Sequence, residues 1–248
     1  MAGSIGSTLM ATPRVLAFDV FGTVVDWRSG IARDSSRFLA EISRSDIDSA
    51  TFADNWRKRY QPAMAEVRDS RRPFVILDVL HREMLEGVLS EYGINPRAIE
   101  PDLLVDWTRA WHRLEPWPDA VVGLTRLKMR YPIVTLSNGN IALMLDVARH
   151  GGLPWDAILG AEVTRAYKPA AEAYLGTAAI LDVSPADLCL VAAHHSDLAA
   201  ARASGLLTAF VNRPMEYGGA EAPDRDQRQE WEWRADGLTD LADQLGCH

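Results

Sequence analysis

VLAFDVFGTVVDW, residues Val15 to Trp27, is the most informative stretch of the sequence. It begins with four apolar residues, Val15 to Phe18, and leads directly into Asp19, which has apolar residues on both sides. An apolar run of this length is typical of a strand that is buried on both faces of a parallel sheet. Because an unpaired buried charge is costly, an aspartate at the end of such a strand favours a functional role.

Other apolar runs of the same kind follow along the chain at Ile133–Leu136, Leu188–Ala192 and Leu207–Val211. Segments with helical periodicity separate them, and this alternation is typical of a doubly wound parallel sheet. Ligands of such α/β folds bind beyond the carboxyl ends of the strands. Polar residues stand at these positions: Asp19, Ser137 with Asn138, and His194 to Asp197. The sequence therefore predicts an α/β fold with a functional site at the carboxyl edge of its sheet.

The pattern changes between Ile31 and Pro116, where helical runs replace strands. The first run covers Asp54–Arg68, in which apolar residues form one helical stripe; further runs cover Leu77–Tyr92 and Asp102–Leu114. A helical block inserted after the first strand is expected to cover the tips of the sheet. We therefore predict a flexible tail over residues 1–12, a core formed by 13–30 and 117–248, and a helical cap domain over 31–116. The polar residues 216–233 are expected to form an excursion before a last helix at Leu238–Leu245.

Composition and charge exclude several classes of protein. The 248 residues are 48% apolar and 24% charged, an ordinary globular balance, and the formal net charge is −8. The sequence contains no basic block, which disfavours a nucleic acid or an anionic membrane as a partner. The N-terminal residues lack the features of a secretory signal, and no apolar run is long enough to span a membrane. Because two cysteines do not make a disulfide framework, we expect a cytoplasmic protein.

Gly22 and Thr23 complete a D-x-x-G-T pattern that begins at Asp19. The pattern predicts a tight turn whose backbone amides converge on the carboxylate. A carboxylate held by such donors stays ionised and keeps one oxygen free to attack an electrophile. By itself the pattern is weak, because an aspartate after a strand can also serve as the cap of a helix or turn.

The stretch resembles the first motif of the haloacid dehalogenase superfamily, in which this aspartate is the nucleophile. Ser137 in TLSNGN resembles the second motif, Lys168 in AYKP the third, and Asp197 in VAAHHSDLAAARASGLLTAFV the fourth. The resemblance extends from Val15 to the C-terminal helix and implies a Rossmann-like core. Within the superfamily, the pattern is most similar to the type II subgroup, the L-2-haloacid dehalogenases.

Phe21 separates this pattern from that of the superfamily's phosphatases. Those enzymes carry a second aspartate two residues after the nucleophile, which protonates the leaving alkoxide. Phe21 cannot donate a proton, but a halide leaves without one. The phosphatases also hold Mg²⁺, usually with an acidic pair in the fourth motif, whereas AAHHSD contains a single acid, Asp197. The sequence therefore argues against a phosphatase, and no cofactor or metal is expected.

The resemblance assigns several residues to the substrate and the halide. Arg57, in NWRKRY, matches a cap arginine at the halide end of the site, where a guanidinium stabilises developing negative charge. The alternative for Arg57 is a solvated arginine on a helix. Asn138 resembles an asparagine that helps to cradle the halide, and Val20 and Phe21 are expected to contact the substrate. Further members of an apolar wall are expected among the aromatic residues Trp27, Trp56 and Phe74.

The remaining assignments concern the nucleophile. Thr23 matches a threonine that positions it, and Ser137 is expected to hold a carboxylate oxygen of the substrate or of the nucleophile. Lys168 resembles the lysine that balances the charge of the nucleophile, and Asp197 is expected to fix Lys168 in place. Tyr174 matches a tyrosine of the subgroup and is expected at the substrate. The alternative for Lys168 is a surface lysine before a proline, and the alternative for Tyr174 is a half-buried core tyrosine.

Two departures from the subgroup concern Phe21 and the fourth motif. The subgroup commonly has a tyrosine where this chain has Phe21, and it has serine and asparagine where this chain has Ala192 and His194. That asparagine is thought to orient the hydrolytic water. His194 or its neighbour His195 is expected to do so here, and a neutral imidazole is a competent base; we favour His194. The departures suggest a branch with a different substrate preference, including smaller or fluorinated acids.

The resulting hypothesis is a two-step hydrolysis. Asp19 attacks the α-carbon of a short-chain 2-haloalkanoic acid, expels halide and inverts the carbon; water then hydrolyses the aspartyl ester to a 2-hydroxy acid. The alternatives are a Mg²⁺-dependent small-molecule phosphatase, a ring-opening hydrolase for a strained cyclic amino acid, and a non-catalytic binding module. The resemblance also allows a homodimer.

Overall fold

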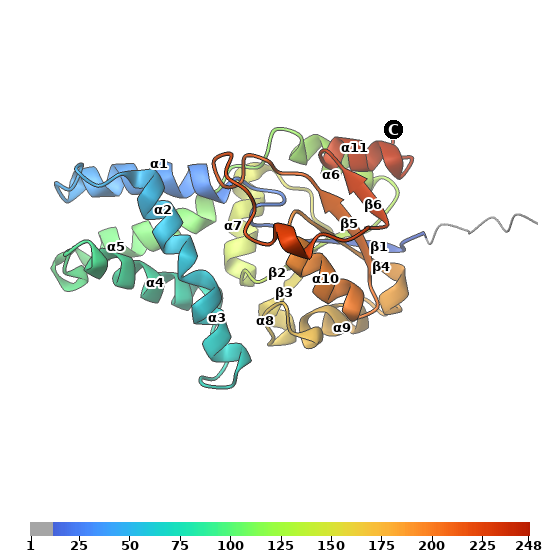
Figure 1. Ribbon diagram of the computed structural model, residues 1–248, viewed down its shortest axis with the longest axis horizontal. Helices are drawn as coiled ribbons and strands as arrows, with labels where there is room; N and C mark the ends of the chain where they lie inside the picture. Colours follow the sequence, from blue (N-terminus) through green and yellow to red (C-terminus); the bar gives the residue numbers. More distant parts are fainter. Residues whose placement is uncertain (1–11) are drawn as a thin grey trace, which may run out of the picture.

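The computed structural model describes residues 12–248 (Figure 1). The predicted tail, residues 1–12, lies outside the described residues except for its last member. Within the described part, the strands form one parallel sheet in the order β3-β2-β1-β4-β5-β6. Their bounds are β1 Val15–Phe18, β2 Ile133–Ser137, β3 Ala157–Gly160, β4 Leu188–Ala192, β5 Leu207–Val211 and β6 Trp233–Ala235. The predicted doubly wound α/β fold is therefore confirmed.

Strand β1 lies at the centre of the sheet, between β2 and β4. Leu16 stands opposite Ile133 of β2 on one side and opposite Cys189 of β4 on the other. Leu16 and Phe18 belong to one hydrophobic cluster, whereas the alternate residues Val15 and Ala17 belong to the cluster on the other face of the sheet. Because both faces are buried, the strand has a continuous apolar sequence.

Helices cover both faces of the sheet. Outside the insertion they are α6 (Ala120–Lys128), α7 (Ile141–Gly151), α8 (Ala161–Thr164), α9 (Ala171–Ile180), α10 (His195–Ala203) and α11 (Leu238–Gln244), with 3₁₀ helices at Pro185–Asp187 and Arg225–Gln227. Apolar residues of α9 and α10 complete one hydrophobic cluster, and apolar residues of α6, α7 and α11 contribute to the other. None of the helices in residues 12–248 combines the length and the apolar character needed to cross a membrane.

Helices fill the region between residues 31 and 116, as predicted. They are α1 (Trp27–Glu41), α2 (Ser49–Lys58), α3 (Tyr60–Arg68), α4 (Leu77–Glu91) and α5 (Pro101–Thr108), with 3₁₀ helices at Pro96–Ala98 and Arg109–Arg113. In Figure 1 the helices α1 to α5 lie together on one side of the sheet. Helix α1 already begins at Trp27, before the predicted boundary. The division into a core and a separate cap domain stays a prediction.

The single helix predicted over Asp54–Arg68 is wrong, because the chain forms two helices that meet at Arg59. Pro62 explains the break, since it has no amide hydrogen to donate to the carbonyl of Lys58. The predicted run Asp102–Leu114 likewise ends early, as α5 gives way to a 3₁₀ helix. The apolar stripe survives the break at Arg59: Trp56, Tyr60 and Met64 are all buried.

Candidate active site

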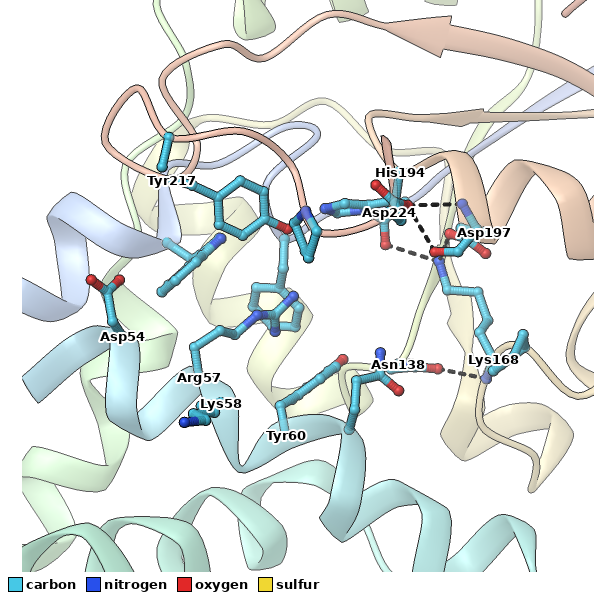
Figure 2. Close-up of a pocket in the computed structure, with 18 of the residues that line it drawn as sticks. Asp54, Arg57, Lys58, Tyr60, Asn138, Lys168, His194, Asp197, Tyr217 and Asp224 are labelled. Carbon is cyan, nitrogen blue, oxygen red and sulfur yellow. Dashed lines mark hydrogen bonds and ion pairs between the residues drawn. The ribbon is translucent and has the colours of Figure 1, made fainter. Parts of the chain in front are cut away.

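A cavity of about 740 Å³ lies at the carboxyl edge of the sheet, between the sheet and the helices α2 and α3 (Figure 2). Asp19 enters it from the end of β1, the central strand. Since β2 and β4 flank β1, the residues after those strands reach the same edge, and Asn138, His194 and Asp197 also line the cavity. Arg57 enters it from α2.

The carboxylate of Asp19 is held by side chains. The Thr23 hydroxyl donates to Oδ2 at 2.7 Å, the Lys168 ammonium donates to Oδ1 at 2.8 Å, and His194 Nδ1 lies 3.2 Å from Oδ2. Thr23 Oγ1 in turn accepts the Ala193 amide at 2.9 Å, which directs its hydrogen toward Asp19. Burial opposes the charged form, but Lys168 and His194 outweigh it and hold the pKa of Asp19 well below its usual range. Asp19 is therefore an ionised, buried carboxylate.

The expectation that backbone amides of the D-x-x-G-T turn converge on Asp19 is not met. The Gly22 amide donates to the Val25 carbonyl at 3.0 Å, and the Val24 amide donates to the Val20 carbonyl at 2.9 Å. The amides of Gly22 and Val24 thus pair with carbonyls of the turn itself. The turn instead presents the Thr23 hydroxyl to the carboxylate.

Lys168 lies between two carboxylates. Its ammonium donates to Asp19 and to Asp197 Oδ2, and the Tyr174 hydroxyl donates to Asp197 Oδ1 at 2.6 Å. Burial lowers the pKa of Lys168, but Asp19 and Asp197 outweigh that effect and raise it above its usual value. The backbone amide of Lys168 also donates to Asn138 Oδ1 at 2.8 Å. Tyr174 was expected at the substrate; it is fully buried behind Asp197 instead and orients that carboxylate.

His194 joins Asp19 to a carboxylate that the sequence did not single out. Its Nε2 lies 2.9 Å from Glu216 Oε1, and the same oxygen accepts Trp27 Nε1–H at 3.0 Å. Burial lowers the pKa of His194, but Glu216 and Asp19 raise it well above the usual value. The raised pKa favours the charged ring over the neutral imidazole base expected at this position, because both ring nitrogens face carboxylates.

His195 faces away from the site. Its ring stacks on Phe210 with 4.5 Å between ring centroids, and its Nδ1 accepts Trp231 Nε1–H at 3.1 Å. This distinguishes the adjacent histidines, as only His194 of the two lines the cavity. The choice of His194 over its neighbour agrees with this placement.

Arg57 brings a positive charge into the cavity, and no carboxylate of the described residues forms an ion pair with it. Its guanidinium carbon lies 4.1 Å from the centre of the Tyr60 ring and 5.2 Å from that of Trp27. Among the described residues, its buried Nη1 has no hydrogen-bond partner. Asn138 Nδ2 donates to Met64 Sδ at 3.3 Å, and a thioether is a weak acceptor. Both groups can therefore donate to an anion; Figure 2 shows Arg57 reaching into the cavity from α2 and Asn138 beside Lys168.

The cavity wall is only partly the predicted one. Phe21 and Trp27 line it, and Phe21 meets the Trp111 ring edge-on at 5.7 Å. Tyr60 and Tyr217 also line it, and the sequence analysis missed both as site residues. The predicted single helix contained a signal for Tyr60, since a residue three positions after Arg57 would lie on the same face of a continuous helix.

Four predicted contacts fall outside the cavity lining: Trp56, Phe74, Val20 and Ser137. Val20 has a fully buried side chain, and its carbonyl serves the turn. Ser137 Oγ accepts the Gly139 amide at 3.1 Å, so it shapes the loop that carries Asn138. In this structure Val20 and Ser137 support the turn and the loop beside the cavity, and the roles predicted for them toward the substrate or the nucleophile stay predictions.

Residues 12–248 contain no group of three or more histidine, cysteine, aspartate or glutamate side chains arranged to hold a metal ion. The groups nearest Asp19 are Lys168, Thr23 and His194. The charge beside the carboxylate thus comes from side-chain cations of the protein.

Comparison with known proteins gives concordant matches. The sequence profile of the haloacid dehalogenase-like hydrolases matches residues 13–205. The (S)-2-haloacid dehalogenase of Xanthobacter autotrophicus is 27% identical over 202 residues, which are 81% of this chain and 75% of that protein. The crystal structure of a defluorinating L-2-haloacid dehalogenase is 48% identical with a TM-score of 0.91, covering 94% of this chain and 95% of that chain. A second L-2-haloacid dehalogenase structure is 45% identical with a TM-score of 0.88, covering 95% and 100%.

Proposed function

The chain belongs to the haloacid dehalogenase-like hydrolases, and we propose that it hydrolyses short-chain 2-haloalkanoic acids to 2-hydroxy acids through an ester on Asp19. The observation that carries the proposal is a cavity with an ionised carboxylate, Asp19, and an unpaired guanidinium, Arg57, in its lining. This pair matches the two demands of the reaction, a nucleophile for carbon and an acceptor for the departing halide. The names of the two relatives at 48% and 45% identity support the same chemistry.

The first step is a displacement at the α-carbon. Oδ1 of Asp19 has one donor, Lys168, whereas Oδ2 faces both Thr23 and His194, so Oδ1 is the freer oxygen to attack. A bond forms between Oδ1 and the α-carbon, while the carbon–halogen bond breaks and its electron pair leaves with the halide. Arg57 Nη1 and Asn138 Nδ2 receive the anion. Phe21 and the aromatic wall exclude water from this step.

The second step is hydrolysis of the aspartyl ester. Water attacks Cγ of Asp19 and releases the 2-hydroxy acid, which regenerates the carboxylate. Attack on the protein carbonyl rather than on the substrate carbon explains why the inverted α-carbon keeps its configuration. Splitting one displacement into two steps is the general gain of covalent catalysis.

The proposal includes catalysis without a metal ion. The ammonium of Lys168 lies 2.8 Å from Asp19 and also contacts Asp197, so it supplies the positive charge that a cation would otherwise bring to these carboxylates. A helical cap over residues 31–116 that closes the cavity is part of the proposal, since α2 contributes Arg57. A homodimer and a cytoplasmic location stay predictions.

The other activities considered from the sequence gain no specific support. A phosphatase of this superfamily needs a proton donor near the leaving oxygen, and the residue two positions after Asp19 is Phe21, whose ring packs against Trp111. A ring-opening hydrolase would use the same ester but has no observation in its favour.

Halide release from a panel of two- to four-carbon 2-haloacids, including fluoroacetate and both enantiomers of 2-chloropropionate, tests the proposed function. We expect the protein to release halide from the (S) enantiomer and to keep full activity in EDTA, because Lys168 supplies the charge beside Asp19. Ion chromatography measures the halide. Mg²⁺-dependent hydrolysis of p-nitrophenyl phosphate without halide release from any haloacid would contradict the proposal.

A further inference from the structure

We infer that Glu216 is a positioning residue that holds His194 as a charged hydrogen-bond donor to Asp19 Oδ2, so that His194 stabilises the oxyanion formed during ester hydrolysis. The inference rests on the proposed function and deepens it. It assigns a role to a residue that lies outside the four motifs and outside the cavity lining.

Glu216 is built into the protein interior beneath the site. Glu216 is only 2% exposed. Its Oε1 lies 2.9 Å from His194 Nε2 and accepts Trp27 Nε1–H at 3.0 Å. Gly22, with a φ of +85°, makes room for it, since a Cβ at this position would lie 2.0 Å from Oε1. A buried carboxylate is costly unless a cation pairs with it. The imidazolium of His194 is the cation that contacts it.

The two oxygens of Asp19 have different surroundings. Lys168 contacts Oδ1, which becomes the ester oxygen in the proposed first step. Thr23 Oγ1 lies 2.7 Å from Oδ2 and His194 Nδ1 lies 3.2 Å from it, and Oδ2 is the carbonyl oxygen of that ester. Hydrogen-bond donors aimed at an oxygen that gains charge in the transition state form an oxyanion hole. Thr23 and His194 thus form an oxyanion hole for hydrolysis.

The geometry also excludes His194 as the base for water. Its Nδ1 faces Asp19 and its Nε2 faces Glu216, so both ring nitrogens are engaged. Both nitrogens of an imidazolium are donors, and neither can accept a proton. The proton of the attacking water must therefore go elsewhere, and we assign it to Asp197, which lines the cavity and shares Lys168 with Asp19.

Hydrolysis of the Asp19 ester begins with attack by water on Cγ. The water oxygen bonds to Cγ, one water proton passes to Asp197, and the carbonyl electron pair moves onto Oδ2, where Thr23 and His194 stabilise it. The pair then re-forms the carbonyl, the Cγ–Oδ1 bond breaks, and the alkoxide takes a proton from Lys168, which recovers it from Asp197. The second water proton leaves Asp19 for solvent. His194 keeps its proton throughout.

Substitution of Glu216 by glutamine tests this role, because E216Q keeps the shape and a carbonyl for Trp27 but removes the charge. In wild-type protein, rapid-quench experiments should show a halide burst followed by turnover. In E216Q the burst rate should change by less than about threefold, whereas kcat should fall about tenfold to a hundredfold, since one charged oxyanion partner is weakened. Intact-protein mass spectrometry should show the ester accumulating. E230Q, at an exposed position of the same segment, is the matched control and should behave as wild type.

The pH dependence provides a second readout, which a merely structural role would not change. The titratable groups that face or neighbour His194 are Asp19, Glu216, Tyr217 and His195. With Glu216 present, the raised pKa of His194 keeps the ring charged as pH increases. Without that carboxylate the pKa falls, so hydrolysis by E216Q should decline at a lower pH than in wild type and recover on acidification. H194N, which keeps a neutral donor, should also accumulate ester, but without this recovery.

Different results would contradict the role of Glu216 and the proposed function. Equal losses of the burst and of turnover in E216Q, or ester hydrolysis at the wild-type rate, would overturn the role of Glu216 while the proposed function stands. Absence of a halide burst and of any ester in the wild-type protein would overturn the proposed function itself. Thermal unfolding of E216Q and E230Q shows whether each variant is folded before its kinetics are compared.

Discussion

Asp19→Asn protein is expected to lose halide release almost completely, with kcat reduced by at least about 10⁴-fold, because an amide is a very poor nucleophile toward carbon. The substitution preserves the size of the side chain and an oxygen that can accept from Thr23 or Lys168. The loss should therefore come from chemistry rather than from collapse of the site. Steady-state halide release and intact mass, which should show no ester, measure it.

Asp46→Asn is the matched control for this variant. Asp46 lies on the surface and forms an ion pair with Arg44 at 2.8 Å, and exposed pairs of this kind contribute little to stability. The control should keep wild-type kcat. Halide release by D19N within tenfold of the wild-type rate would rule out Asp19 as the nucleophile, provided that mass spectrometry shows that the asparagine is intact.

Arg57→Lys is expected to reduce kcat/KM by roughly 10²- to 10³-fold, although the positive charge is retained. The guanidinium carbon lies 4.1 Å from the centre of the Tyr60 ring. Its buried Nη1 has no hydrogen-bond partner among the described residues. A lysine ammonium on a flexible chain does not reproduce this planar arrangement. Because Arg57 acts on the departing halide, the burst rate should fall while hydrolysis of preformed ester stays unchanged. This is the opposite of the kinetic pattern expected for E216Q.

Arg59→Lys provides the control from the same turn of the chain. Arg59 pairs with Glu91 through a partly exposed side chain outside the active-site cavity, so its replacement should leave the burst rate within about twofold of wild type. A wild-type burst rate in R57K would contradict the assignment of Arg57 to the halide end.

The sequence predicted the parts of the fold that depend on local patterns. The bounds of β1, β4 and β5 agree with the predicted runs because strands buried on both faces are continuously apolar. Strand β3 was missed because its first three residues are only half-buried, and β6 because it is only three residues long with an exposed middle residue. Such short edge strands carry too little periodicity to recognise.

Site residues that directly follow a strand could be predicted from the sequence. Residues that reach the site only through tertiary contacts could not. Asp19, Asn138 and His194 follow β1, β2 and β4, so their meeting follows from the order of the strands. Glu216 belongs to a polar segment without periodicity, and its contact with Trp27 joins residues 189 positions apart. The contact of Glu216 with His194 raises the pKa of that histidine, contrary to the neutral ring expected from the sequence. No local pattern contains that information.

The central claim, a covalent ester on Asp19, is tested most directly by a single turnover in ¹⁸O-labelled water with enzyme in excess over (S)-2-chloropropionate. Water that attacks Cγ of the ester leaves its oxygen in the protein, so the first turnover should place ¹⁸O in the carboxylate of Asp19. Mass spectrometry of the peptide that contains Asp19 and of the lactate product measures both. We predict a labelled peptide and unlabelled lactate; labelled lactate with an unlabelled peptide would contradict an ester on Asp19.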